Sequence, residues 1–390
     1  MQPAADPRTR EAATMLRVYG QLPFVPERAT GCDIITTDGR RILDLYGGHA
    51  VAALGYSHPH LINAITEQSK SLLFQSNAVA LDVRAQAAEK LIGVAPRNLR
   101  RVFFVNSGAE ANENALRMAC VATGRSKVLA ITQGFHGRTA AAGAVTWNSD
   151  SWYGFPQKPF DVAFIPRDDC DAAAAMINKD VAAVIVEPVQ GVAGAYDLTQ
   201  EFLTTLREHT ARQGALLIAD EVQSGVGRCG QFFAVQVYGI EPDILTSAKA
   251  LGGGIPCGAV LCTRQLATRF GPGDLGSTFG GGPVAAAAIV AVIDSIDRED
   301  LLANVRAREA QIREQCIVGP VRKIQGKGLL LGLLCDRPAV EVRDELLTHD
   351  ILTGTSADTD VLRVLAPLII ESRHIDQLAH ALASLAPPTN

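Results

Sequence analysis

Short apolar runs rich in β-branched residues recur through the middle of the chain, and helical patterns follow them. Six such runs occupy residues 101–105, 127–131, 161–165, 182–186, 215–219 and 258–262. A strand that is apolar on both faces belongs in a sheet that helices cover on both sides. The alternation therefore predicts an α/β fold built from βαβ units. In such folds, catalytic residues gather on the loops after the carboxyl ends of the strands.

The two ends of the chain follow a different pattern. An Asp-Gly dipeptide at 38–39 separates two short segments of alternating polar and apolar residues, which is typical of a hairpin. In the C-terminal part, helical patterns surround a glycine-punctuated run and a strand over 361–365. We expect a smaller α+β domain formed by residues 1–50 and 299–390, beside a large domain over 51–298.

The composition is that of a folded globular protein. The chain has 390 residues, of which 47% are hydrophobic and 20% charged, and this excludes a disordered or collagen-like chain. Its 36 Lys and Arg residues against 41 Asp and Glu give a net charge of −5. Without a basic excess or a basic run, the sequence argues against nucleic acid as a partner.

The sequence also bears on location. The first residues are polar and have no apolar core, so we expect no secretory signal. The longest apolar stretch, Val284 to Ile293, is well short of the roughly 18 residues that a membrane span needs. The eight cysteines have neither Cys-x-x-Cys spacing nor a nearby histidine cluster. We therefore expect free thiols, no metal site, no membrane partner and a cytoplasmic location.

Three separate stretches carry candidate chemistry. The run at 101–105 leads through a Ser-Gly-Ala turn at 107–109 into a helical segment, and backbone N–H groups at such a helix start offer a phosphate site. The run at 215–219 ends in Asp220. Lys249 lies among small apolar residues before three glycines, and a desolvated lysine has a lowered pKa that suits Schiff-base chemistry.

Each feature also has an ordinary explanation. Ser107 suits a helix cap, and the stem of Lys249 could lie along an apolar surface. In this order on an α/β sheet, however, the three features meet the needs of pyridoxal 5′-phosphate (PLP). That cofactor needs a phosphate cradle, an anion for its pyridinium nitrogen and an amine for its aldehyde. The combination favours an enzyme.

Six motifs resemble those of class III aminotransferases, and most closely the acetylornithine/ornithine aminotransferase branch. They are NSGAEANE at 106–113, FHGR at 135–138, EPVQG at 187–191, DEVQSG at 220–225, AKALGGG at 248–254 and STFGG at 277–281. The resemblance implies a PLP-dependent enzyme of fold-type I. Such an enzyme has a large domain with a mostly parallel seven-stranded sheet, a smaller α+β domain, and homodimeric active sites shared between subunits.

The resemblance also implies which residues surround the cofactor ring. Lys249 would hold the cofactor covalently and then act as general acid and base. Asp220 would pair with the pyridinium N–H and keep the ring protonated. Phe135 would stack on the ring face, Gln223 would contact the ring hydroxyl, and Glu187 would support the same polar network.

The phosphate would have its own set of contacts. Ser107, Gly108 and Ala109 would cradle it at the helix start, in line with the phosphate site that the residues themselves predict. Thr278 of the neighbouring subunit would complete the cradle.

Two arginines are implied to bind substrate carboxylates, which a guanidinium can grip with two hydrogen bonds. Arg138 would hold the carboxylate far from the reacting amine, and Arg363 the α-carboxylate of glutamate and 2-oxoglutarate. The family usually has a glutamate after its EPxQG motif that masks the second arginine, but this chain has Val192 there. Either α-amino acids bind more easily here, or another residue does the masking.

Two further positions bear on substrate size. Tyr19 resembles a tyrosine that contacts the substrate carboxylate in ornithine aminotransferases. Gly48 stands where those enzymes carry a bulky tyrosine and acetylornithine enzymes a glycine, which leaves room for an acyl group. His49 beside it is either a polar support for the site or a packed core histidine.

We therefore predict transfer of the ω-amino group of N-acetylornithine, or of a close N-acylated diamino acid, to 2-oxoglutarate, as a step of arginine or related amino-acid biosynthesis. The alternatives are ornithine, N-acyl-lysine, γ-aminobutyrate or another diamine as donor, or an aminomutase. A non-catalytic cofactor-binding protein is the alternative from another class, and the presence of Lys249 and Asp220 argues against it.

Overall fold

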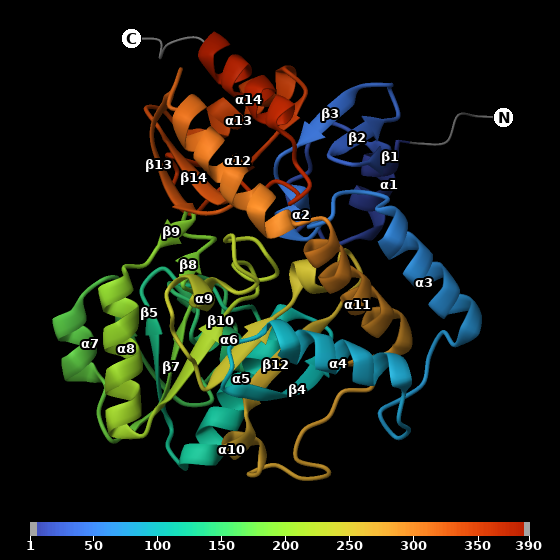
Figure 1. Ribbon diagram of the computed structural model, residues 1–390. Coiled ribbons are helices and arrows are strands. Elements are labelled where there is room, and N and C mark those ends of the chain that lie inside the picture. The colour runs from blue at the N-terminus through green and yellow to red at the C-terminus, as the bar shows by residue number, and fades with distance from the viewer. Residues whose placement is uncertain (1–5, 386–390) are drawn as a thin grey trace.

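A seven-stranded sheet lies at the centre of the larger part of the structure, a computed structural model that describes residues 6–385 (Figure 1). Its strand order is β4–β12–β11–β10–β7–β5–β6. The strands are β4 (Leu99–Val105), β5 (Lys127–Ile131), β6 (Asp161–Ile165), β7 (Val181–Val186), β10 (Leu216–Asp220), β11 (Ile244–Ser247) and β12 (Gly258–Thr263). β12 is antiparallel to both neighbours, and the other pairs are parallel. The predicted α/β fold with a mostly parallel sheet is confirmed.

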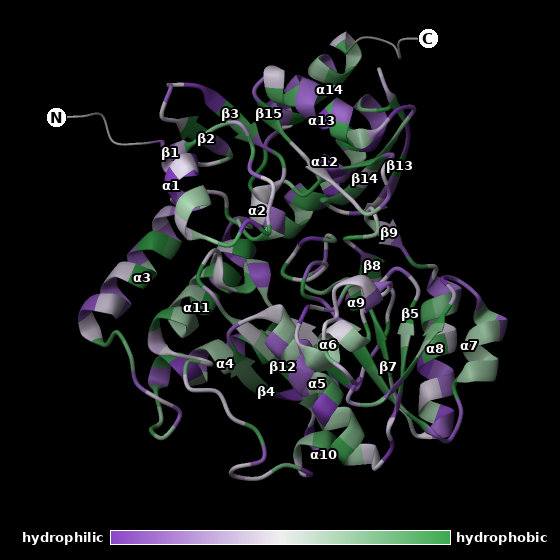
Figure 2. Cartoon of the chain, turned by 180° about the vertical axis from the view of Figure 1, so that it is seen from behind, coloured by the Kyte–Doolittle hydropathy of each residue, from purple (hydrophilic) through white to green (hydrophobic). Residues whose placement is uncertain are grey.

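Helices cover both faces of this sheet because its strands are apolar on both sides. In β7, Val184 and Val186 pack into one hydrophobic cluster, and Ala183 and Ile185 into a second one. The first cluster includes α3 (Pro59–Ser71), α4 (Asp82–Val94), α7 (Cys170–Met176), α8 (Gln200–Gln213) and α11 (Pro283–Arg298). The second includes α5 (Gly108–Thr123), α6 (Ala140–Ala144) and α10 (Arg264–Ala267). Figure 2 shows the matching hydrophobic colour along β7.

The apolar pattern predicts six of these strands and misses β11. That strand is short, and its last two residues are the polar Thr246 and Ser247. Both are nevertheless fully buried. β10 and β12 pair with β11 on its two sides, so tertiary pairing rather than local composition makes this segment a strand.

Residues from both chain ends build the other part of the molecule, where blue and red elements lie together in Figure 1. The predicted hairpin is present between β2 and β3, and Gly39 adopts the positive φ of +87° that its turn requires. A C-terminal strand, β15, extends the N-terminal sheet beside β3. This sheet consists of β1 (Pro26–Thr30), β2 (Asp33–Thr36), β3 (Arg41–Asp44) and β15 (Ile351–Leu352).

A second four-stranded sheet, in the order β13–β14–β17–β16, completes the C-terminal part. Its strands are β13 (Val321–Lys327), β14 (Leu330–Cys335), β16 (Gly354–Thr355) and β17 (Val361–Val364), and the helices of this part are α12 (Leu301–Gln315), α13 (Ala339–Thr348) and α14 (Ser372–Ser384). The short elements elsewhere are α1 (Pro7–Thr14), α2 (Gly47–Ala50), α9 (Ala234–Val237), the strands β8 (Val189–Gln190) and β9 (Tyr196–Asp197), and two 3₁₀ turns, η1 (Ser149–Ser151) and η2 (Lys249–Gly252). All eight cysteines are free, as expected. No helix within residues 6–385 is long and apolar enough to cross a membrane.

Candidate active site

A cavity of about 350 Å³ gathers most of the site residues that the sequence predicts. Its predicted members are Tyr19, Gly108, Ala109, Phe135, Arg138, Glu187, Asp220, Gln223 and Lys249. Most of these residues lie at or after the ends of β4, β5, β7 and β10, which are strands of the central sheet. The cavity therefore forms where the loops after parallel strands converge, as the fold class leads one to expect.

Lys249 lies just beyond β11 at the first position of η2, in a strained backbone conformation. Its φ is +47°, a left-handed value that is costly for a residue with a side chain. Burial lowers the pKa of Lys249, and the charge of Arg363 acts in the same direction, whereas Asp220 and Glu187 oppose it. The result is an amine that loses its proton more readily than an exposed lysine.

Asp220 is the last residue of β10 and is only 3% exposed. Its Oδ1 accepts a hydrogen bond from the Val222 amide at 3.0 Å. Its Oδ2 contacts two side chains, Nδ1 of His136 and Nδ2 of Asn112, each at 2.7 Å. The carboxylate is therefore fixed in orientation while it lines the cavity.

His136 and Asn112 also belong to the site, although the sequence pattern does not single them out. Both line the cavity, and both lie inside motifs, one in FHGR and the other in NSGAEANE. Asn112 also donates to the His136 carbonyl at 2.7 Å and accepts from the Thr246 hydroxyl at 2.7 Å. Its position four residues after Gly108 puts both on one face of α5, and this spacing was the available signal.

Glu187 is buried and ties two loops together. Its carboxylate accepts from the Phe135 amide at 2.8 Å and from the Gly191 amide at 3.2 Å. Burial raises the pKa of Glu187 to about 7, the charge of His136 works against that rise, and Asp220 adds to it. Near this loop, Oε1 of Gln223 is buried without a hydrogen-bond partner among the described residues.

The start of α5 has the features of an anion site. The hydroxyl of Ser107 caps the helix by accepting from the Glu110 amide at 3.1 Å. The amides of Gly108 and Ala109 make no hydrogen bond to another described residue, so both are available where they line the cavity. Ser107 itself is exposed and does not line the cavity.

The two predicted carboxylate-binding arginines are placed differently. Arg138 is exposed at the cavity, with its guanidinium carbon 4.7 Å from the ring centre of Trp152 and 6.0 Å from that of Phe135. Arg363 lies in β17, is 6% exposed and does not line the cavity. It reaches the cavity wall indirectly, because its Nη1 donates to the carbonyl of Gly191 at 3.1 Å, next to Val192, which lines the cavity.

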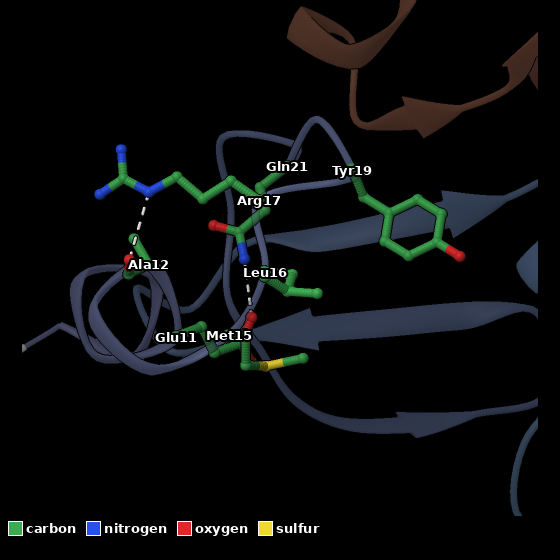
Figure 3. Close-up of a pocket in the computed structure, with 7 residues that line it drawn as sticks. All are labelled: Glu11, Ala12, Met15, Leu16, Arg17, Tyr19 and Gln21. Carbon is green, nitrogen blue, oxygen red and sulfur yellow. Dashed lines mark hydrogen bonds between the residues drawn. The ribbon is translucent and has the colours of Figure 1, made fainter. Parts of the chain in front are cut away.

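The remaining predicted residues are exposed in the single chain. Gly48 and Thr278 lie outside the cavity. Tyr19 is 86% exposed, and it lines both this cavity and a neighbouring one formed by the N-terminal segment. In Figure 3 the ring of Tyr19 points away from the other residues of that neighbouring cavity. His49 is exposed rather than packed in a core, which leaves its polar role open.

The solved structures that resemble this fold include several aminotransferases. The chain matches an ornithine aminotransferase from Toxoplasma gondii with a TM-score of 0.91 and 27% identity, over 96% of this chain and 92% of the other. That structure is described as having PLP at partial occupancy in its active site. An acetylornithine aminotransferase from Elizabethkingia anophelis matches with a TM-score of 0.85 and 28% identity, over 96% of this chain and 97% of the other.

The sequence comparisons narrow the class to one family. A family model described as aminotransferase class-III matches residues 14–385. An acetylornithine aminotransferase of Corynebacterium efficiens is 39% identical, over 99% of this chain and 98% of the relative. The corresponding enzyme of Bacillus subtilis is 37% identical, over 96% and 97%. The chain belongs to the class-III aminotransferases and is a PLP-dependent aminotransferase, as the motifs indicate.

The described residues fit this cofactor. The unpartnered amides of Gly108 and Ala109 suit a phosphate, and the buried carboxylate of Asp220 suits a protonated ring nitrogen. Lys249 offers an amine in the same cavity. The unpartnered Oε1 of Gln223 is a buried acceptor that a hydroxyl donor would satisfy.

Proposed function

We propose that this aminotransferase moves the ω-amino group of N-acetylornithine, or of a close N-acylated diamino acid, to 2-oxoglutarate, giving a semialdehyde and glutamate. The observation that carries this proposal is one cavity in which Lys249, Asp220 and Arg138 meet. This cavity occurs in a chain that is 36–39% identical to curated relatives over nearly their whole length, and those relatives are named acetylornithine aminotransferases. The pathway in question would be arginine biosynthesis.

Two groups of the chain would take part in the chemistry, the amine of Lys249 and the carboxylate of Asp220. When bound, PLP supplies an electron-accepting ring joined to the carbon that carries the amino group. Lys249 would bind the cofactor and then move a proton at the substrate carbon, a role that its lowered pKa supports. Asp220 would hold a proton at the ring nitrogen, with His136 and Asn112 fixing its carboxylate.

Other residues would position the cofactor. Gly108 and Ala109 would bind the phosphate through their amides, with Ser107 capping the helix beside them. Phe135 would lie against the ring face, and its backbone is held by Glu187. Gln223 would take the ring hydroxyl.

Arg138 would bind the α-carboxylate of the acylated donor, with its guanidinium plane supported by the ring of Trp152. Arg363 would bind the α-carboxylate of glutamate and 2-oxoglutarate, so that a dicarboxylate contacts both arginines. Tyr19 lines the same cavity as Arg138 and would contact the donor carboxylate. Gly48 would leave space for the acyl group.

We further propose that the enzyme acts as a homodimer. Several large apolar residues of the single chain are exposed near the loop that carries Thr278: Leu73 is 67% exposed, Phe74 43% and Phe279 63%. The rings of Phe74 and Phe279 lie 5.2 Å apart, so they form one apolar surface. A second subunit covering this surface would bring Thr278 to its partner's phosphate site.

The same proposal includes two domains and a location. The large domain covers 51–298, the smaller one covers 1–50 and 299–390, and the location is cytoplasmic. The pairing of β3 with β15 supports joining the two chain ends in one domain.

The first experiment is the visible absorption spectrum of the purified holoenzyme before and after addition of N-acetylornithine, with no keto acid present. A shift of the band of the bound cofactor supports the donor. A band that is present and does not move rules out N-acetylornithine. Ornithine, N-acyl-lysine, γ-aminobutyrate and diamines are then the next donors, and an aminomutase would be recognised by turnover without 2-oxoglutarate.

A further inference from the structure

Arg363 is a buried cation that has no acidic partner among the residues that the structure describes. No carboxylate oxygen within residues 6–385 lies within 4.0 Å of its guanidinium, although the side chain is nearly inaccessible. Its donors reach neutral oxygens instead: the carbonyl of Thr355 at 2.7 Å from Nε, the carbonyl of Gly191 at 3.1 Å from Nη1, and the hydroxyl of Tyr46 at 2.8 Å from Nη2. Neutral acceptors satisfy the hydrogen bonds but leave the charge uncompensated.

Of these three acceptors, only the Tyr46 hydroxyl belongs to a side chain. The ring of Tyr46 packs against Gly354, where a side chain would collide with it, since an added Cβ would lie 1.9 Å from the ring. The ring centre also lies 5.5 Å from the guanidinium carbon of Arg363. The ring is therefore held in place, which fixes its hydroxyl oxygen beside Nη2 of Arg363.

His49 is the second hydrogen-bond partner of the Tyr46 hydroxyl. Its Nδ1 lies 2.8 Å from the Tyr46 oxygen, and the two rings meet edge to face with centres 4.8 Å apart. Because the Tyr46 oxygen accepts from Arg363, its proton is free to be donated to Nδ1, which requires a neutral imidazole. Desolvation, together with the charges of Arg363 and Lys249, lowers the pKa of His49 and favours that neutral form.

The backbone around His49 is strained. Residues 47–50 all have positive φ, including His49 at +65° and Ala50 at +67°, which carry side chains. Consecutive left-handed residues are costly and persist only where the surrounding structure fixes them. This turn, α2, packs against η2, the segment that carries Lys249. His49 therefore lies on a turn that packs beside the segment of Lys249.

We propose that Tyr46, held by His49, is a neutral latch on Arg363 that sets the preference between substrates with one and with two carboxylates. The latch occupies Nη2 while a substrate lacking a second carboxylate is bound. A dicarboxylate such as 2-oxoglutarate displaces the hydroxyl, because a carboxylate makes charge-assisted bonds that a phenol cannot match. The proposal rests on the proposed function, in which Arg363 receives the second carboxylate.

The test is calorimetric binding of glutarate, an unreactive five-carbon dicarboxylate, to the holoenzyme. Tyr46→Phe keeps the ring and removes the competing acceptor, so glutarate affinity should rise about 2- to 10-fold. Tyr196→Phe is the matched control, because that hydroxyl donates to Asp168 away from the cavity. Its glutarate affinity should equal that of the wild type.

A pair of His49 variants tests whether the contact of His49 with Tyr46 supports the latch. His49→Asn can place an oxygen near Nδ1 and tolerates positive φ, so glutarate binding should stay near the wild-type value. His49→Leu removes the acceptor and should tighten glutarate binding in the same direction as Tyr46→Phe. A thermal melt of each variant separates these effects from loss of folding.

The outcomes separate the latch from the proposed function. If Arg363→Gln leaves glutarate affinity unchanged, Arg363 is not the carboxylate site and that part of the proposed function fails. If Arg363→Gln weakens binding but Tyr46→Phe leaves it equal or weaker, the carboxylate site stands and the latch is overturned. Tighter binding in Tyr46→Phe and in His49→Leu, but not in His49→Asn, is the result that supports the latch.

Discussion

Nδ1 of His136 lies 2.7 Å from Oδ2 of Asp220, although 84 residues separate the two in the chain. Both side chains are nearly inaccessible, with His136 2% and Asp220 3% exposed. Such a buried pair of hydrogen-bonding groups restricts the carboxylate to one orientation. The contact explains how a single strand-end aspartate can present a fixed anion in the cavity.

His136 therefore has a testable positioning role. We expect His136→Leu to lower kcat/KM about 10-fold and to weaken cofactor retention, since a hydrogen bond to a charged group is lost. His136→Asn can return an N–H near the position of Nδ1 and should recover much of the loss. Steady-state kinetics and cofactor release on dialysis measure both effects. Equal impairment in the two variants would mean that the ring acts by packing alone.

Lys249 is expected to be the only lysine bound covalently to the cofactor. Lys249→Ala should remove the borohydride-trapped label and lower kcat by about 10²- to 10⁴-fold, the range for loss of a general acid-base group. Peptide mapping by mass spectrometry locates the label. Lys158→Ala, which alters a lysine paired with Asp150 at the surface, is the control. Label on any other lysine of the wild type would contradict the assignment.

Val192 is expected to influence donor choice. Val192→Glu would place a carboxylate at the cavity wall next to Gly191, whose carbonyl already binds Arg363. An acid there competes with the α-carboxylate of glutamate, so the efficiency with glutamate should fall roughly 10-fold relative to the ω-amino donor, or ~1.4 kcal/mol. Val192→Gln is the uncharged control. An unchanged ratio of the catalytic efficiencies with glutamate and with the ω-amino donor would contradict this prediction.

Glu221 is expected to make stability depend on pH. It is 0% exposed, it accepts from the Ser224 hydroxyl at 2.6 Å and from the Val235 amide at 2.7 Å, and burial raises its pKa to about 7. Because its pKa is higher in the folded state than in the unfolded state, its stabilising contribution is full below pH 4.5 and is lost as the pH rises through 7.

Glu221→Gln removes this titration, and Ser224 can turn its hydroxyl to accept from the new amide. The variant should gain free energy of unfolding relative to wild type between pH 5 and pH 8, by about 1–3 kcal/mol. Denaturant titrations at the two pH values measure the change. Glu314→Gln, at an exposed position, should show no such trend. A difference that is the same at both pH values would falsify this account of Glu221.

The sequence predicts the architecture well where the pattern is local. Six of the seven central strands appear as apolar runs, and the turn at 38–39 follows from its Asp-Gly dipeptide. The apolar pattern misses β11 because Thr246 and Ser247 are polar, and only their neighbours in the sheet bury them. Local composition carries no information about pairing partners.

The same division holds for the site. Lys249, Asp220 and the start of α5 stand out in the sequence, because a lysine among small apolar residues and a helix start after a strand are local signals. The contacts of His136 with Asp220 and of Tyr46 with Arg363 join residues that are distant in the chain. Tyr46 and Arg363, for example, are 317 residues apart.

The sequence by itself determined the family and the cofactor and predicted the residues of the reaction centre, because the motifs lie in short continuous stretches of the chain. Tertiary structure alone decided which side chains hold the reacting groups in position. Hydrogen bonds depend on distances of about 3 Å between atoms, and only the folded sheet and its loops bring those atoms together. Arg363 illustrates this, since its charge is visible in the sequence but its neutral partners are visible only in the fold.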